Sequence, residues 1–218
     1  MKRIAKRWLL PLIFLTAFIL WTVALGRVDV QPIGPNGSAV GFATVNGFVH
    51  RLTGVCMPIY TITDWLGLVP VFIGFAFAAL GLAQWIKRKH ILKVDFSILM
   101  LGAFYLLMLA VYLLFETVVI NYRPVLINGY LEVSYPSSTT LLTLCVMPTT
   151  AWQLRRRIRT ACLRRVVTAV IALFMVFMVG GRLLAGVHWL TDIVGGGLLA
   201  AAMVSLYDVL CRDKEQNE

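Results

Sequence analysis

The chain has 218 residues, of which 60% are hydrophobic and 14% are charged, and its mean hydropathy is +0.84. The net charge of +10 comes from 20 lysines and arginines against 10 acidic residues. Because ordinary soluble domains carry about 25% charged residues, this composition excludes disorder and collagen-like structure and disfavours a soluble enzyme. We predict an integral membrane protein with several helical spans in a single domain, residues 1–218.

Six apolar stretches predict an all-α fold, a polytopic bundle of six transmembrane helices. They cover residues 8–25, 66–86, 96–120, 139–154, 166–184 and 193–210. Most approach the ~20 residues that a spanning helix needs. The fourth is short and polar, with several threonines and Pro148. Because such a helix is tolerated only where neighbours shield it from lipid, we expect it at the centre of the bundle.

The first stretch has an alternative interpretation as a cleaved signal peptide. Residues 1–26 combine a basic start with an apolar run. We favour a retained span, because the run is long for a signal peptide and no clean small-x-small site follows it. The rest of the topology is the same in either case.

Residues 26–65 are expected to form an extracytoplasmic loop. The loop is rich in glycine and proline at its start, and residues 42–52 are mildly amphipathic. We expect that stretch to lie flat on the membrane surface.

Basic residues alternate between the two sides of the predicted bundle. Sixteen fall in residues 1–7, 87–93, the basic loop 155–165 and the C-terminal tail, whereas four fall on the other side. The positive-inside rule then places both termini in the cytoplasm of a multi-pass protein of the cell (plasma) membrane. It also accounts for the net charge without nucleic acid, and no base-stacking pattern accompanies the charges.

Three polar clusters fall on the side away from the basic loops. Arg123 follows the third stretch and Ser137 opens the fourth. Arg182, His188 and Asp192 link the fifth stretch to the sixth. The distribution of basic residues did not by itself require these three polar clusters to lie on the same side.

The chemistry of these clusters indicates a phosphate site. Arginine offers a fork of donors that matches phosphoryl oxygens, and Ser137 stands at a helix start, where an anion is favoured. His188 and Asp192 are four residues apart and share a helix face. A carboxylate there can hold one ring nitrogen of His188 and leave the other free to attack an electrophile. Taken singly, each residue is better explained by anchoring, a structural hydrogen bond or an N-cap; together, on one side and at these spacings, they favour a phosphate site.

The constellation resembles the type 2 phosphatidic acid phosphatase family of membrane lipid phosphatases. The family's third motif, Ser-Arg, five residues, His, three residues, Asp, is matched from Gly181 to Asp192 except at its first serine. The resemblance implies that His188 is the nucleophile that forms a phosphohistidine and that Asp192 orients it. It also implies that Arg123, Ser137 and Arg182 hold the phosphoryl oxygens.

Two positions depart from the family pattern. Glu116 stands seven residues before Arg123, where the family has lysine, and Thr139 stands where the family's general acid stands. A threonine hydroxyl is too weak an acid to protonate a departing alkoxide at neutral pH. An ionised Glu116 would repel phosphate, unless it pairs with Arg123 or Arg182; a protonated Glu116 is an alternative acid.

The sequence therefore predicts a phosphatase of a lipid phosphate or diphosphate, such as a polyprenyl diphosphate, acting at the extracytoplasmic face. The alternatives are a catalytically impaired relative that binds or helps to translocate a lipid phosphate, and a structural membrane subunit. The four cysteines lack metal or disulfide spacing. We expect no cofactor and no metal, a lipid phosphate and the bilayer as partners, and no nucleic acid; the oligomeric state stays open.

Overall fold

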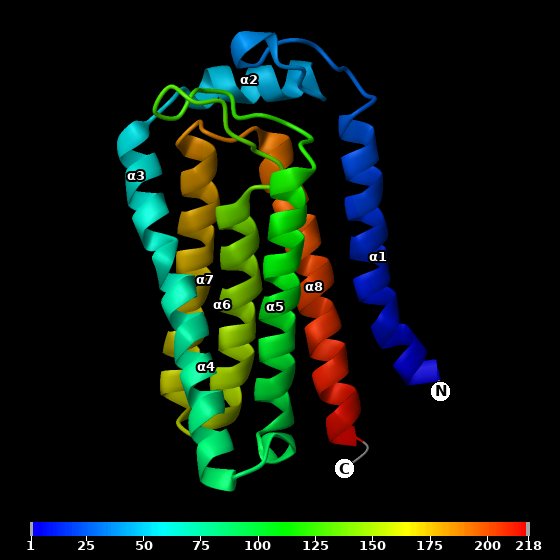
Figure 1. Cartoon of the computed structure of the whole chain (residues 1–218), viewed down its shortest axis with the longest axis vertical. Coiled ribbons are helices and arrows are strands. Elements are labelled where there is room, and N and C mark those ends of the chain that lie inside the picture. The colour runs from blue at the N-terminus through cyan, green and yellow to red at the C-terminus, as the bar shows by residue number, and fades with distance from the viewer. Residues whose placement is uncertain (1, 217–218) are drawn as a thin grey trace.

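The computed structural model of the protein describes residues 2–216, and the side chains of residues 7–214, as a bundle of long helices (Figure 1). Residue 1 and residues 217–218 lie outside the described part. The elements are α1 (Lys2–Leu25), η1 (Pro35–Gly37), α2 (Ala43–Thr53), α3 (Met57–Leu66), α4 (Leu68–Arg88), η2 (Ile91–Lys93), α5 (Phe96–Thr117), α6 (Ser138–Arg157), α7 (Ala161–Leu184) and α8 (Leu190–Gln216).

Within residues 2–216 the bundle has six long helical segments, in agreement with the predicted all-α membrane fold. They are α1, the joined pair α3 and α4, α5, α6, α7 and α8. Within residues 2–216, five of these segments are long and apolar enough to cross a membrane. The sixth, α6, is too polar to qualify by its composition.

The polar helix α6 lies at the centre of the bundle, as predicted. It packs against α4, α5, α7 and α8, and Thr140, Thr143 and Gln153 on it are buried. The side-chain amide of Gln153 donates to the hydroxyl of Tyr207, 2.7 Å away, and to the carbonyl of Ser97, 2.9 Å away. Because neighbouring helices satisfy these groups, α6 can remain polar where lipid could not.

The second span begins earlier than predicted. We expected a span over residues 66–86 after a loop over residues 26–65, but α3 starts at Met57 and meets α4 at Gly67. Pro58 occupies the first turn of α3, a favoured position for proline, and apolar residues alternate with Thr61, Thr63 and Asp64 in the rest of the helix. The loop proper therefore ends at residue 56. The basic loop 155–165 is also mostly helical, because only residues 158–160 separate α6 from α7.

The two ends of the bundle differ in charge. Both described chain ends, the α4–α5 connection and the α6–α7 connection lie at one end (Figure 1). The segment 26–56, the α5–α6 loop and the α7–α8 loop lie at the other, which we call the distal end. The basic segments of the sequence thus gather at the end of the termini, in agreement with the predicted alternation.

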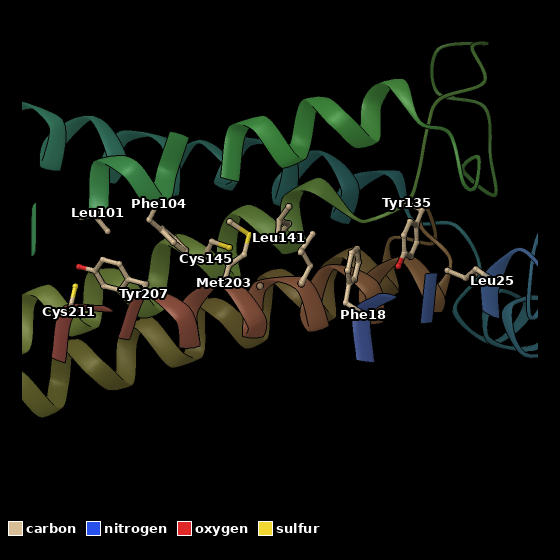
Figure 2. Close-up of a cluster of buried hydrophobic side chains, with 12 residues drawn as sticks. Phe18, Leu25, Leu101, Phe104, Tyr135, Leu141, Cys145, Met203, Tyr207 and Cys211 are labelled. Atoms are coloured by element: carbon tan, nitrogen blue, oxygen red, sulfur yellow. The ribbon is translucent and has the colours of Figure 1, made fainter. Parts of the chain in front are cut away.

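A buried apolar cluster runs along α1, α5, α6 and α8 (Figure 2). Aromatic rings form much of it: the ring centroids of Phe104 and Tyr207 lie 5.4 Å apart, and those of Phe18 and Tyr135 lie 6.3 Å apart. Tyr135 belongs to the α5–α6 loop, so the cluster also anchors that loop against the helices.

Two glycines of α8 allow the same loop to approach the helix closely. A Cβ atom at Gly195 would lie 2.4 Å from the ring of Tyr135, and one at Gly196 would lie 3.1 Å from the carbonyl oxygen of Ser137. A side chain at either position would therefore displace the loop. The hydroxyl of Tyr135 is also 2.7 Å from that of Thr22 on α1.

Helix α2 lies across the distal end of the bundle (Figure 1). Its bounds differ by one residue at each end from those of the predicted amphipathic stretch, residues 42–52. Asn46 on α2 is fully buried. Its side chain accepts a hydrogen bond from the backbone N–H of Thr191 (3.2 Å) and donates to the Thr191 hydroxyl (2.9 Å). Since N-terminal amides of a helix need such partners, α2 caps the start of α8.

Candidate functional site

The α5–α6 loop folds into a hairpin over residues 121–134, which we call the distal hairpin. Antiparallel bridges pair Tyr122 with Val133 and Ile127 with Tyr130. Asn128 and Gly129 form the turn, with φ values of 51° and 83°. An Asn-Gly pair is the favoured chemistry for a two-residue hairpin turn, because both central residues need positive φ.

The hairpin register places four polar side chains on one face. The N–H of Ser134 donates to the carbonyl of Asn121 (2.9 Å), and the N–H of Arg123 donates to the carbonyl of Glu132 (3.0 Å). Opposed residues share a face, as do residues two apart along each strand. Asn121, Arg123, Glu132 and Ser134 are therefore presented together to the α7–α8 loop and the start of α8.

His188 lies in the α7–α8 loop and meets this face. Its Nε2 atom is 3.3 Å from Nη1 of Arg123, and its Nδ1 atom is 3.1 Å from the hydroxyl of Ser134. The imidazole is buried. The two residues most important to the predicted phosphate site, Arg123 and His188, are thus in contact although 65 residues separate them.

The Asp192 carboxylate lies one turn into α8, fully buried behind His188. Its Oδ2 atom accepts hydrogen bonds from the Ser134 hydroxyl and from the backbone N–H of Trp189 (2.9 Å). Its Oδ1 atom accepts one from the side-chain amide of Asn121 (3.2 Å). The distance between Oδ2 of Asp192 and Nδ1 of His188 is 3.9 Å.

The environment keeps His188 uncharged at neutral pH. Burial lowers its pKa to about 4, and the charges of Arg123 and Arg182 act in the same direction against the raising effect of Asp192. Desolvation disfavours the protonated ring, so His188 retains a lone pair for nucleophilic chemistry at pH 7.

Arg182, near the end of α7, is buried and is held by α3. Its Nη1 atom lies 3.5 Å from Oδ1 of Asp64 and 3.4 Å from the hydroxyl of Thr63. The guanidinium stands 5.0 Å from the ring centroid of Tyr60. The Nε atom of Arg182 is buried without a hydrogen-bond partner.

Ser137 and Thr139 stand at the start of α6 but face different neighbours. The backbone N–H of Ser137 donates to the carbonyl of Asp192 (3.1 Å), while its hydroxyl is buried without a partner. Thr139 lies against the α3–α4 junction, where a Cβ atom at Gly67 would be 3.7 Å from its methyl group.

Glu116 lines a cavity, and among the described side chains it forms no ion pair with Arg123 or Arg182, which was one of the alternatives considered for it. Within residues 2–216, Arg123 pairs with Glu132, whose Oε2 atom is 3.0 Å from Nε, and Arg182 pairs with Asp64. The hairpin register places Glu132 beside Arg123, and α3 places Asp64 beside Arg182, whereas Glu116 at the end of α5 pairs with neither arginine. The cavity has a volume of about 480 Å³, and its wall includes Tyr112, Glu116, Arg123, Glu132, Ser138 and His188.

Sequence reasoning found three of the contacting side chains and missed their supports. Arg123, His188 and Asp192 converge, whereas Arg182 makes its contacts with α3. The missed residues are Asp64, Asn121, Glu132 and Ser134. The Asn128-Gly129 pair between two apolar runs was a usable signal for the hairpin and hence for Glu132 and Ser134; no sequence signal links Asp64 to Arg182.

Comparison with known proteins shows what the chain resembles in sequence and in fold. Residues 117–212 match the model of the PAP2 superfamily, the type 2 phosphatidic acid phosphatases. The fold is similar to the crystal structure of the first transmembrane PAP2 type phosphatidylglycerolphosphate phosphatase from Bacillus subtilis. The TM-score is 0.59 at 18% identity, over 94% of this chain and 96% of that one. A comparison with curated protein sequences gives no match. The chain is therefore a PAP2-like membrane protein, similar to that superfamily in sequence over residues 117–212 and to a PAP2-type phosphatase in fold over nearly its whole length.

Proposed function

We propose that the protein is a membrane phosphatase that removes a phosphoryl group from a lipid phosphate or diphosphate at the distal end. The observation that carries the proposal is the contact between a buried neutral imidazole and a guanidinium, His188 and Arg123, 3.3 Å apart. A nucleophile beside an oxyanion-binding cation is what phosphoryl transfer needs.

Two buried donors without partners support a bound anion at this place. The Ser137 hydroxyl and Nε of Arg182 are buried and make no hydrogen bond. Leaving buried polar groups unpaired costs about 1–3 kcal/mol each, and phosphoryl oxygens would satisfy both. Arg182 is close enough for its charge to act on both Arg123 and His188.

The proposed reaction has two steps. In the first, Nε2 of His188 attacks phosphorus, the bond from phosphorus to the leaving oxygen breaks, and the leaving group keeps the electron pair. Arg123 moves from Nε2 to a phosphoryl oxygen. In the second, water attacks the phosphohistidine and the P–N bond breaks, its electron pair returning to Nε2. Inorganic phosphate leaves with the oxygen and both protons of water, as dihydrogen phosphate, and His188 returns to its neutral form.

Thr139 at the general-acid position favours a diphosphate substrate over a phosphate ester of an alcohol. A phosphate leaving group departs as a stable anion and needs little protonation, whereas an alkoxide needs an acid. Of the lipids considered, a polyprenyl diphosphate fits this requirement best, and phosphatidic acid fits it poorly.

An apolar cavity gives room for the lipid chain. It has a volume of about 850 Å³, lies between α4 and α5, and reaches Val146 on α6. Tyr105 and Met108 of α5 line it, and Tyr112 and Glu116, further along the same stripe of α5, line the cavity beside His188. Residues at this spacing share one helix face, so a single stripe leads from the apolar cavity to the phosphate site.

A second candidate function is binding of a lipid phosphate without hydrolysis. The observation that favours it is the pairing of Arg123 with Glu132 and of Arg182 with Asp64, together with Thr139. Carboxylates already neutralise the charge of both arginines. This neutralisation weakens the stabilisation of the phosphoryl-transfer transition state more than it weakens the binding of a lipid phosphate.

The test is phosphate release by purified protein from a panel of lipid mono- and diphosphates. We expect release from polyprenyl diphosphate, little from phosphatidic acid, and none in a His188→Ala variant. Equal rates on both lipids would reject the diphosphate preference. Tight lipid binding without an acid-labile phosphohistidine on His188 would support the binder instead.

One auxiliary role for Glu116 is tested in the same assay. If a protonated Glu116 supplies the missing acid, Glu116→Gln abolishes turnover. Retained activity excludes that role. As to location, we propose the plasma membrane, with both termini cytoplasmic, on the basis of the basic residues at that end of the bundle.

A further inference from the structure

We propose that Ser134 is a positioning residue that links His188 to Asp192 and so holds the imidazole with its proton on Nδ1. The inference deepens the proposed function, on which its kinetic consequence rests. Ser134 lies outside the motifs by which the site was predicted, on the second strand of the distal hairpin.

The geometry leaves Ser134 as the bridge between the two residues. Nδ1 of His188 is 3.9 Å from Oδ2 of Asp192, which is beyond hydrogen-bond distance. The Ser134 hydroxyl is 3.1 Å from Nδ1 and donates to Oδ2. All three side chains are buried, so water does not compete for these contacts from bulk solvent.

The directions of the hydrogen bonds follow from the chemistry of the partners. Arginine has donors and no acceptor, so the contact of Arg123 with Nε2 is a hydrogen bond only when Nε2 carries its lone pair. A neutral imidazole has one N–H, which must then be on Nδ1. That N–H donates to Oγ of Ser134, and the hydroxyl proton of Ser134 is directed to Asp192.

The Asp192 carboxylate is held in place by donors other than His188. Asn121 and the backbone N–H of Trp189 already donate to the carboxylate. Its negative charge acts on the ring directly across 3.9 Å, whereas its hydrogen-bonded link to the ring runs through Ser134. When Nε2 attacks phosphorus, the ring becomes positive and keeps its Nδ1 proton, and the relay stabilises this charge while Nε2 forms the bond.

The experiment uses the full chain in detergent with ¹⁵N-labelled histidine. The sequence has three histidines, His50, His90 and His188, so ring-nitrogen signals can be assigned by single His→Asn variants. At pH 7 we expect His188 as one neutral form with a protonated Nδ1. In Ser134→Ala we expect a mixture of the two tautomers, and in Ser134→Thr, which retains the hydroxyl, a return toward the wild-type form.

Kinetics provide the second measurement. On polyprenyl diphosphate, Ser134→Ala should lower kcat by about 10- to 100-fold, as loss of an outer-shell support commonly does, with little change in KM. The matched control is Ser205→Ala on α8, whose hydroxyl bonds only the carbonyls of Ala201 and Ala202; it should keep the wild-type rate.

The outcomes separate the two claims. An unchanged Nδ1-protonated form and rate in Ser134→Ala would show that Arg123 or Asp192 holds the tautomer without Ser134, and would overturn the proposal. If wild-type protein releases no phosphate from any lipid, the proposed function fails, while the tautomer measurement still decides the role of Ser134. Should the alanine variant not fold, Ser134→Cys, with a weaker donor and acceptor, should give an intermediate mixture; a spectrum identical to wild type would again overturn the proposal.

Discussion

At the scale of single residues, the site combines an uncharged nucleophile with cations that already have counter-charges. His188 is kept neutral by burial, whereas Arg123 and Arg182 each pair with a half-exposed or exposed carboxylate. Phosphate binding therefore requires an exchange of anions on the two arginines. Protonation of the His188 ring should lower activity, whereas removal of a carboxylate that competes with phosphate for an arginine should have the opposite effect.

The first residue-scale prediction concerns pH. Because the pKa of His188 lies near 4 and not near 6.5, the ring stays neutral as the pH falls from 7 to 5. The rate of phosphate release from polyprenyl diphosphate should therefore fall through protonation of His188 only around pH 4. A pH–rate profile measures this, and an acid limb centred near pH 6.5 would show that the ring is not desolvated as described.

A second prediction concerns Glu132. Replacing it by glutamine removes the carboxylate that competes with phosphate for Arg123. We expect inhibition by inorganic phosphate to strengthen by roughly three- to tenfold, which corresponds to ~0.7–1.4 kcal/mol. Asp95→Asn is the matched control, since the Asp95 carboxylate, paired with Arg88 at the other end of the bundle, is about as exposed as that of Glu132. Equal effects of the two changes, or a weaker inhibition in Glu132→Gln, would contradict the competition.

At the scale of elements, the distal hairpin sets the register of the site. Four of its side chains reach Asp192, His188 or each other only while Asn121 is opposite Ser134 and Arg123 opposite Glu132. A shift of one residue would turn all four to the other face. The turn chemistry of Asn128 and Gly129 therefore matters to catalysis, although neither residue lines the cavity beside His188.

This yields a prediction for Gly129→Val. Gly129 has a φ of +83°, and no atom lies within 4 Å of an added Cβ, so the cost is backbone strain of about 1–2 kcal/mol. We expect kcat/KM to fall about tenfold, the equivalent of ~1.4 kcal/mol, with a small change in Tm. Gly37→Val is the control, because Gly37 has a φ of +73° and similarly open surroundings away from the site; a similar loss of activity there would refute the explanation.

At the scale of the whole molecule, the arrangement of charge predicts the orientation in the membrane. Basic residues gather at the end that carries the termini, and the candidate site lies at the distal end. If positive loops stay in the cytoplasm, the hairpin tip and the α6–α7 connection must lie on opposite sides of the bilayer.

Cysteine labelling tests this orientation. Cys162 is exposed beside the α6–α7 connection, and Tyr130 at the hairpin tip is 74% exposed. In a Cys56→Ser background, a membrane-impermeant maleimide should label Tyr130→Cys on intact cells and Cys162 only after permeabilisation. Labelling of both sites on intact cells would contradict the predicted topology.

Some features of the fold and of the site could be predicted from the sequence, and others could not. The six stretches and the central place of α6 were predictable because hydropathy and the cost of polar groups in lipid act locally along the chain. The start of the second span at Met57 was missed, because Thr61, Thr63 and Asp64 interrupt the apolar residues of α3. Within the site, the spacing of His188 and Asp192 was readable. The contact of Ser134 with these two residues was not, since the Asn128-Gly129 signal indicates a hairpin but not what the hairpin packs against.

By itself, the sequence determined the class of the molecule, its spans, its asymmetry of charge and the likeness of its last motif to PAP2 proteins, because each of these is written in short runs of neighbouring residues. Only the tertiary structure decided that Glu132 and Asp64, rather than Glu116, neutralise the arginines and that Ser134 stands between His188 and Asp192. These contacts join residues up to 118 positions apart in the chain. Contacts of that kind depend on how the hairpin and α3 pack against the bundle, which no local pattern records.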